Sequence, residues 1–393
     1  FALTMGTRQT MGLFLSDVNT ATGLGIANIS LAFAFGQLWW GLTQPFAGAF
    51  ADRIGAGRVL LIGVSLVALG TILTPMMTST AGLVFAIGVL AAGGAGMAGP
   101  SVLMAATTRM LPAEKRGMAT GIVNAGGSFG QFIMAPVAAG LTAALGWMTS
   151  MQVLGLIVLL ALPAAWVLRG NSSAAAGSAP TSVVGGAAPV REGTRAAITR
   201  ALADPSYRLL ACGFFVCGFH VAFLATHLPN VVAMCGLPPA VSAWSLGLLG
   251  LFNIVGSLAM GWAVGRWRMK SLLSLVYAAR AVAVLVFLLS PKTATTMLIF
   301  AAVMGLTYLS TVPPTAGLVA KFFGPANMAT LFGIVMLSHQ IGGFTGAWLG
   351  GKVFTMTGSY DTIWIIDILL AVGAALVHMP IKEAALPPKV QPA

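Results

Sequence analysis

The chain has 393 residues, of which 58% are hydrophobic and only 7% are charged, and its mean hydropathy is +0.94. A soluble protein of this length carries about 25% charged residues, so the composition excludes a water-soluble globular fold. The net charge of +12 does not indicate nucleic-acid binding, because the basic residues fall in alternate loops. The three cysteines match no metal or redox spacing. We expect an all-α membrane protein in a lipid bilayer, with no cofactor, no metal and no nucleic-acid partner.

Six apolar segments fill the first part of the chain, and each is long enough to cross a bilayer, which takes about 20 residues. The expected spans are residues 1–15, 24–50, 59–76, 81–107, 118–145 and 148–168. Because the chain opens inside an apolar run, we expect that an N-terminal piece precedes Phe1. Residues 1–168 are thus predicted to form a first bundle of six helices.

A polar stretch follows, and its composition differs from both flanks. Residues 171–189 are rich in Ser, Ala, Gly and Pro, which is typical of a flexible linker. Residues 191–203 have the pattern of a short amphipathic helix on the membrane surface. We therefore expect a linker over 169–206, a second bundle over 207–381 and a tail over 382–393. The second set of spans is 209–228, 239–264, 272–289, 296–322, 329–354 and 362–381.

The basic residues indicate how these spans are oriented. Of the 20 Lys and Arg, 16 fall in loops on one side, two fall in loops on the other, and Arg8 and Arg280 lie within spans. Basic loops stay in the cytoplasm, so both termini and the central linker are predicted to be cytoplasmic. This pattern indicates a multi-pass protein of a bacterial inner membrane.

A charged turn between spans 2 and 3 recurs in the second half. The segment from Gly48 to Arg58 reads G-A-F-A-D-R-I-G-A-G-R, and a related turn, from Gly261 to Arg266, follows 213 residues later. Other matches near this offset pair Gly6 and Arg8 with Gly218 and His220, and Pro100 with Pro313. The first turn resembles the signature of the major facilitator superfamily, and the resemblance covers nearly the whole chain. It implies two six-helix bundles related by a pseudo-two-fold axis, with a substrate cavity between them and alternating access.

Ionisable groups inside a membrane are costly and therefore point to function. In the family, span 1 lines the cavity, so Arg8 is a candidate anchor for an anionic substrate, whose carboxylate a guanidinium can bind with two hydrogen bonds. A structural contact is the alternative. His220, at the matching position of span 7, is a candidate for substrate binding or for proton coupling.

Further polar residues lie at a similar depth. His339 is a second candidate for proton coupling, with close helix packing as the alternative. Asn124, Asn253, Tyr308 and Gln340 can contact the substrate, although such residues more often bond neighbouring helices.

Three charged residues have ambiguous positions. Arg280 in span 9 and Asp367 in span 12 lie at comparable depth on helices that are outer in this fold, so we favour a structural ion pair, with a substrate contact by Arg280 as the alternative. Asp17 borders span 1. It is a candidate for gating and proton coupling, and the alternative is that it belongs to an ordinary solvated turn.

The charged turns themselves are expected to act in gating. By the resemblance, Asp52, Arg53 and Arg58 pin the ends of helices in one state, and Asp52 can use the dipole of span 11. The second copy keeps Arg266 but has Gly265 in place of the acid, so the lock is predicted to be asymmetric.

The position of Arg8, the short loops and the linker resemble the monocarboxylate and oxalate–formate transporter branch. That branch often has an Arg and an Asp in span 8, where this chain has Asn253 and Ser257. We expect a monomeric secondary transporter that moves a small organic anion together with protons. The alternative is a proton-driven efflux pump for drugs or metabolites. No nucleophile–base spacing or phosphate loop points to an enzyme.

Overall fold

The structure is a computed structural model that describes residues 1–100, 102–103, 113–167, 194–323 and 328–384. Most of the expected linker therefore lies outside the described residues. So do the side chains of two candidates, Asp52 and Asn124.

All the regular secondary structure described in the first half of the chain is helical. Its helices are α1 (Ala2–Thr10), η1 (Met11–Phe14), α2 (Leu15–Thr22), α3 (Ile26–Ile54), α4 (Ala56–Leu73), η2 (Thr74–Met76), α5 (Thr80–Leu83), η3 (Val84–Ala92), α6 (Gly93–Met97), α8 (Ala113–Leu145), α9 (Trp147–Leu159) and α10 (Leu162–Val167). Single helices form expected spans 2 and 5, whereas spans 1, 3, 4 and 6 are each built from consecutive shorter pieces.

The second half begins with α11 (Thr194–Ala203), which lies within the segment predicted to be amphipathic and buries Ala197 and Ala201. The remaining helices are α12 (Pro205–Met234), α13 (Pro239–Val264), α14 (Met269–Leu289), α15 (Ala294–Thr307), α16 (Val312–Phe323), α17 (Met328–Thr357) and α18 (Asp361–His378). The two pieces α15 and α16 together form expected span 10.

Nine helical segments of the described chain are long and apolar enough to cross a membrane. The other three expected spans are helical as well: span 1 (residues 1–15) covers α1, η1 and the first residue of α2, span 2 is α3 and span 11 is α17. The all-α membrane fold predicted from the sequence is therefore confirmed.

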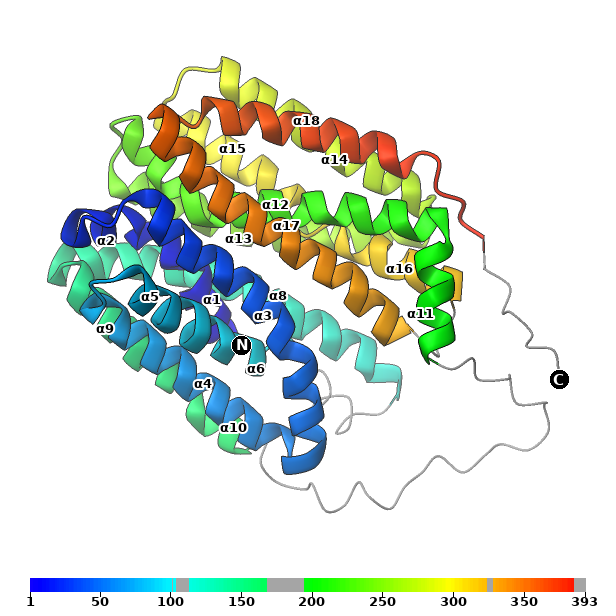
Figure 1. The fold of residues 1–393 in the computed structure, drawn as a ribbon, viewed down its shortest axis with the longest axis horizontal. Coiled ribbons are helices and arrows are strands. Elements are labelled where there is room, and N and C mark those ends of the chain that lie inside the picture. The colour runs from blue at the N-terminus through cyan, green and yellow to red at the C-terminus, as the bar shows by residue number, and fades with distance from the viewer. Residues whose placement is uncertain (101, 104–112, 168–193, 324–327, 385–393) are drawn as a thin grey trace.

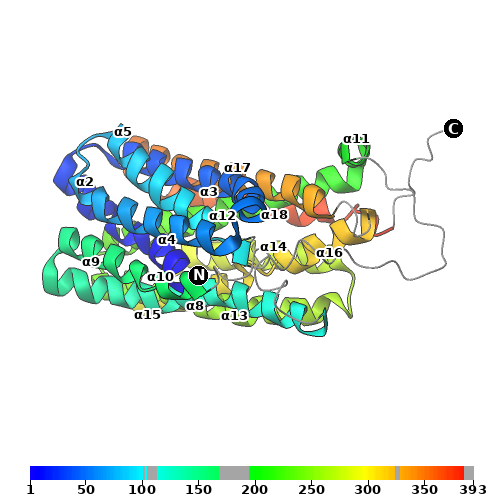
Figure 2. The ribbon, with the colours of Figure 1, turned by 90° about the horizontal axis from the view of Figure 1, so that it is seen from below.

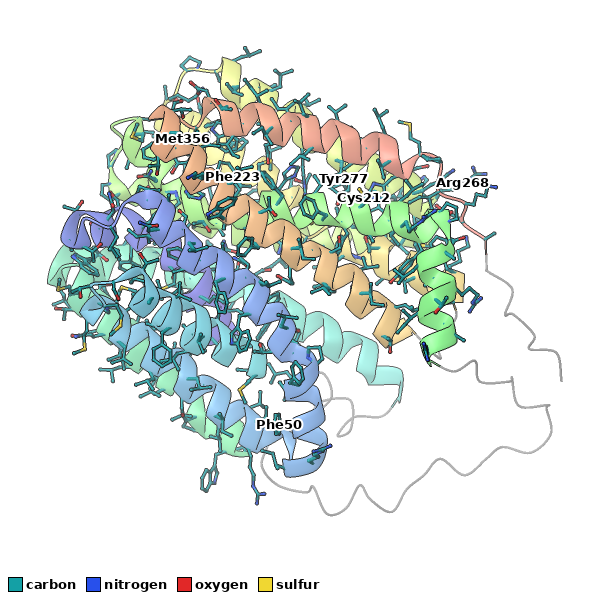
Figure 3. All side chains as sticks on the ribbon, viewed as in Figure 1. Phe50, Cys212, Phe223, Arg268, Tyr277 and Met356 are labelled. Atoms are coloured by element: carbon teal, nitrogen blue, oxygen red, sulfur yellow. The ribbon has the colours of Figure 1, made fainter. Side chains whose placement is uncertain are left out.

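The two halves lie side by side and contact each other along two seams (Figures 1 and 2). In one seam α3 packs against α17, and in the other α8 packs against α13. Each half also has its own apolar core. The core of the second half includes the buried Phe223, which lies inside the bundle in Figure 3. By contrast, the side chain of Phe50 on α3 is exposed.

The α3–α17 seam closes at one end and opens at the other. A Cβ atom placed on Gly41 would lie 2.3 Å from Gln340 of α17, so the helices touch there. One heptad further toward the linker, on the same faces, lie Gly48 and Gly333, and a Cβ atom on either would meet nothing within 4 Å. The two helices thus diverge toward the end of the molecule where α11 lies, which we call the linker end because α11 follows the linker in the sequence (Figure 1).

The opposite end is closed by a tight contact between spans 1 and 7. A Cβ atom on Gly12 would lie 2.2 Å from the carbonyl oxygen of Ala225 on α12. Only glycine allows the 3₁₀ turn of span 1 to approach the other half this closely.

Candidate substrate site and buried polar network

Arg8 lies near the end of α1 and points into the space between the helices of the first half. Its Nη2 donates a hydrogen bond of 2.6 Å to Oε1 of Gln37 on α3, and its guanidinium lies 4.9 Å from the centre of the Trp40 ring. A cavity of about 30 Å³ borders Arg8 and Gln37. A space of this size holds a water molecule or two, and all the residues that line it belong to the first half.

The charge of Arg8 has no acidic partner among the described residues. Its guanidinium also interacts electrostatically with Tyr308 of span 10, in the second half. Among the described residues, no carboxylate forms an ion pair with Arg8. A half-buried guanidinium with one hydrogen-bonded neighbour keeps donors for a ligand, and a carboxylate fits that geometry.

Span 10 is broken beside this site because two consecutive prolines follow Val312. Pro313 and Pro314 have no backbone N–H, so they cannot pair the carbonyl groups of Leu309 and Ser310 in the helical pattern, and the helix is interrupted between Thr307 and Val312. A side chain of a neighbouring helix binds two carbonyl groups at the end of α15. Nη2 of Arg280 on α14 donates to the carbonyl oxygens of Thr307 and Tyr308, the latter at 2.7 Å.

Asn253 of α13 joins this break to the first half. Its Oδ1 accepts a hydrogen bond of 3.0 Å from the backbone N–H of Leu309 and one of 3.2 Å from Ser257. Its Nδ2 donates to Oγ of Ser128 on α8, at 2.8 Å. All its polar atoms are therefore used in bonds between helices.

Tyr308 is also engaged within the protein. Its side chain is buried, and its hydroxyl group donates a hydrogen bond of 2.9 Å to the carbonyl oxygen of Val221 on α12. It borders the site through its electrostatic contact with Arg8.

The direct ion pair expected between Arg280 and Asp367 does not form; His220 lies between them. Nη1 of Arg280 contacts Nδ1 of His220 at 3.4 Å, and Nε2 of His220 lies 3.1 Å from Oδ1 of Asp367. The prediction of the pair was wrong because sequence gives the depth of each residue but not its rotation about the helix axis. His220 points into the second bundle, between α14 and α18, and away from Arg8.

His339 and Gln340 are neighbours on α17 with different surroundings. Neither ring nitrogen of His339 has a well-aligned hydrogen-bond partner in the described structure, although the ring lies beside the Cys217 thiol and packs against Phe214, at 4.9 Å between centres. Gln340 points across the seam to Gly41, and its Nε2 is also unpaired. Buried polar atoms without partners are rare, so both side chains can still take a ligand or a water molecule.

Two further side chains at this level were not singled out from the sequence. Gln37 holds Arg8, and Gln131 of α8 is fully buried with neither amide atom paired among the described residues. The only signal in the sequence is an amide inside an apolar run, which more often reflects helix packing.

The charged turns lie at the linker end, where Arg53, Arg58 and Arg266 are exposed. Arg266 stacks over the Trp262 ring at 4.0 Å and donates to the Trp262 carbonyl oxygen. The role of Asp52 stays a prediction, because its side chain is outside the described residues.

Asp17 lies in the first turn of α2, at the closed end of the molecule, and is half-buried. Burial raises the pKa of its carboxyl group above the ordinary value of 3.8. This end carries the contact between Gly12 and α12, so Asp17 lies where a gate residue would be placed.

Comparisons with known proteins agree with this architecture. The family model of the Major Facilitator Superfamily matches residues 1–346 and 210–392. The chain is 24% identical to monocarboxylate transporter 13 of Rattus norvegicus over 96% of this chain and 86% of the relative. It is 23% identical to the oxalate:formate antiporter of Oxalobacter formigenes over 98% of this chain and 90% of the relative.

Among solved structures, a bacterial homologue of the human lysosomal transporter Spinster, in an inward-facing and unoccupied conformation, superposes with a TM-score of 0.76 at 14% identity. That match covers 96% of this chain and 93% of the Spinster homologue, and it concerns the fold alone. The chain belongs to the Major Facilitator Superfamily and is a multi-pass membrane transporter, not an enzyme.

Proposed function

We propose that this transporter carries a small organic anion and that Arg8 binds its carboxylate group. The observation that carries the proposal is the state of Arg8: a half-buried cation, bonded to Gln37 and facing Tyr308, with no acidic partner in the described structure. A buried charge normally needs a counterion. An anionic substrate supplies one and gains a bidentate pair.

The names of the relatives support the same substrate class. One is a monocarboxylate transporter and another is an oxalate:formate antiporter, and both match over nearly the full length of this chain. Span 8 lacks charged residues near its middle, where Asn253 bonds other helices instead. The cation therefore comes from span 1, and Gln340 and Gln131 are the polar side chains we expect to contact the rest of the substrate.

Alternating access follows from the two seams. The α3–α17 seam is closed at Gly41 and open at Gly48, and the far end is closed at Gly12. Rocking about the middle would open the far end and close the linker end. We propose that the linker lies in the cytoplasm, as the basic loops predict, so that the open end of this seam faces inward. We also propose that the transporter is a monomer of the inner membrane and that protons are its coupling ion.

The test is uptake of labelled acetate, lactate, pyruvate and oxalate into proteoliposomes with and without a pH gradient. Arg8→Ala is expected to abolish uptake, and Arg8→Lys to retain only a small part of it, because an ammonium group cannot form the bidentate pair. Arg195→Ala, which removes an exposed cation on α11, is the matched control and is expected to transport normally.

Two results would overturn the proposal. One is wild-type protein that is folded but moves no carboxylate, in which case lipophilic cations and drugs become the substrates to test. The other is carboxylate transport that Arg8→Ala leaves unchanged.

A further inference from the structure

A group of ionisable side chains lies inside the second half, separate from Arg8. It consists of Arg280 on α14, His220 on α12 and Asp367 on α18, and each of the three residues is only 1% exposed. The family places its cavity between the halves, whereas this group is enclosed within one bundle. A buried charged group of this kind needs a functional explanation.

The contacts determine where the protons lie on His220. Arginine has only donors, so Nδ1 of His220 must accept from Nη1 of Arg280. The ring proton therefore lies on Nε2, which faces Oδ1 and the backbone carbonyl oxygen of Asp367 at 3.1 and 3.2 Å. A second proton on Nδ1 would point at the guanidinium, so His220 is held as a neutral bridge.

Asp367 is the acidic residue of this group, and the contacts of its carboxyl group leave room for a proton to bind. Its Oδ1 lies near Nε2 of His220 but is not properly aligned for a hydrogen bond, and no other partner among the described residues reaches it. The charged or titratable groups around it are Arg280 and Tyr277 from α14 and Cys217 and His220 from α12. Tyr277 and Cys217 face Arg280, at 5.3 Å from the ring centre and 3.8 Å from the sulfur.

Helix α17, which also packs against α18, brings one titratable side chain near this group: His339 lies beside the Cys217 thiol and packs on Phe214. Lys352 of the same helix is exposed. Tyr277 lies within the second half, and its hydroxyl group donates to the Gly213 carbonyl oxygen at 2.7 Å (Figure 3). Arg280 is therefore the one full charge that Asp367 meets in the described structure.

A continuous set of contacts joins this group to the seam between the halves. Arg280 holds the carbonyl groups of Thr307 and Tyr308 at the break of span 10. The next residue, Leu309, is bonded to Asn253, and Asn253 is bonded to Ser128 of the first half. A change in how tightly Asp367 attracts Arg280 therefore acts directly on the broken segment that borders Arg8.

We propose that Asp367 is a proton-binding site, that His220 stays neutral, and that Arg280 transmits the protonation of Asp367 to the break of span 10. The proton comes from water and returns to water, and no other bond forms or breaks. The link to transport rests on the proposed function, whereas proton binding by Asp367 does not.

Proton binding is tested without transport by infrared difference spectra of the purified protein in nanodiscs during a pH titration. We expect a titrating C=O component of a protonated carboxylic acid that the wild type and Asp17→Asn both show and that Asp367→Asn lacks. Asp361→Asn removes an exposed acid from the same helix and should keep the band. A wild type without such a band, or a band that Asp367→Asn retains, would overturn the proposal.

The variant His220→Gln tests which of the two residues, Asp367 or His220, binds the transported proton. The glutamine amide can accept from Arg280 and donate to Asp367, as the neutral ring does, but it cannot take a proton. The variant is therefore expected to keep both the carboxyl band and stimulation of uptake by a pH gradient. Loss of gradient stimulation with normal folding would assign the proton to His220 and reject this proposal.

In proteoliposomes, Asp367→Asn should abolish stimulation by the pH gradient while exchange of labelled for unlabelled carboxylate continues. Gradient stimulation that survives in this variant would contradict the proposal. If the wild type exchanges no carboxylate at all, the proposed function fails, and the infrared titration still decides whether Asp367 binds a proton.

Discussion

Asn253 on α13 and Ser128 on α8 join the two halves of the molecule through a hydrogen bond of 2.8 Å from the amide Nδ2 to the hydroxyl oxygen. Hydrogen bonds between membrane helices contribute about 0.6 kcal/mol on average. We expect Ser128→Ala to lower the free energy of unfolding by about that amount. Asn253→Ala should lower it by about 1–3 kcal/mol, because it also leaves the Leu309 N–H without its acceptor.

A double-mutant cycle of these two residues, measured by denaturation in detergent, isolates the bond across the seam. Its coupling energy should be close to the cost of Ser128→Ala alone. A coupling energy of zero would mean that the two side chains act independently.

Gln37 allows the role of Arg8 to be tested without removing the cation. Gln37→Glu keeps the shape of the side chain but places a carboxylate 2.6 Å from Nη2 of Arg8, where it competes with an anionic substrate. We expect at least a tenfold weaker affinity for the substrate and unchanged or higher stability. The measurement is substrate binding by calorimetry, together with a thermal melt.

Gln37→Ala is the control, because it removes the same hydrogen bond without adding a charge. It should weaken binding much less than Gln37→Glu. Equal binding in Gln37→Glu and the wild type would indicate that Arg8 has only a structural role.

The architecture could be predicted from sequence because apolar length and basic loops are strong signals. The predicted amphipathic segment of residues 191–203 contains α11, and span 7 was expected from residue 209, close to the start of α12 at Pro205. The repeat offset also placed spans 1 and 7 as counterparts, and the structure brings them into contact at Gly12.

The polar contacts could not be predicted, because they depend on helix rotation and on the break in span 10. The depth of Arg280 and Asp367 suggested a direct pair, yet a side chain from a third helix, His220, lies between them. Span 10 was expected as one segment over residues 296–322, so neither its break at Pro313 and Pro314 nor the side chains that bind the backbone groups there were predicted.

Gly12 tests whether the closed end needs close contact between spans 1 and 7. Gly12→Ala would place a methyl group 2.2 Å from the Ala225 carbonyl oxygen, and such overpacking costs about 1–3 kcal/mol. We expect a lower melting temperature and slower transport. Gly373→Ala on α18, where a Cβ atom meets nothing within 4 Å, should be neutral or slightly stabilising. Equal melting temperatures for the two variants would contradict the contact.

Asp17 should make stability depend on pH in a specific direction. Because burial raises its pKa in the folded state, the folded protein keeps this proton to higher pH than the unfolded chain does. Stability contributed by Asp17 therefore falls as pH rises from the ordinary value of 3.8 through the raised one. Asp17→Asn should then melt at a higher temperature than the wild type at pH about 7, and the difference should shrink toward pH about 4.

Asp361→Asn is the matched control for this effect, because Asp361 also lies in the first turn of a helix but is exposed. It should lower stability by about 0.3–1 kcal/mol through the lost interaction with the helix dipole. If Asp17→Asn is destabilising to the same extent at neutral pH, burial of Asp17 does not govern its contribution.

The buried group of Arg280, His220 and Asp367 predicts strongly non-additive effects on stability. When Asp367 is ionised, Arg280→Gln alone leaves it as an uncompensated charge and frees the carbonyl groups of Thr307 and Tyr308, so we expect a loss of about 3–5 kcal/mol at a pH where Asp367 has lost its proton. Combining it with Asp367→Asn removes the orphaned charge, so the double variant should be more stable than Arg280→Gln. Arg266→Gln, at an exposed position, should change stability by less than about 0.5 kcal/mol. Additive losses in unfolding experiments would show that Asp367 is neutral beside Arg280 in the folded protein and that the two residues do not interact through charge.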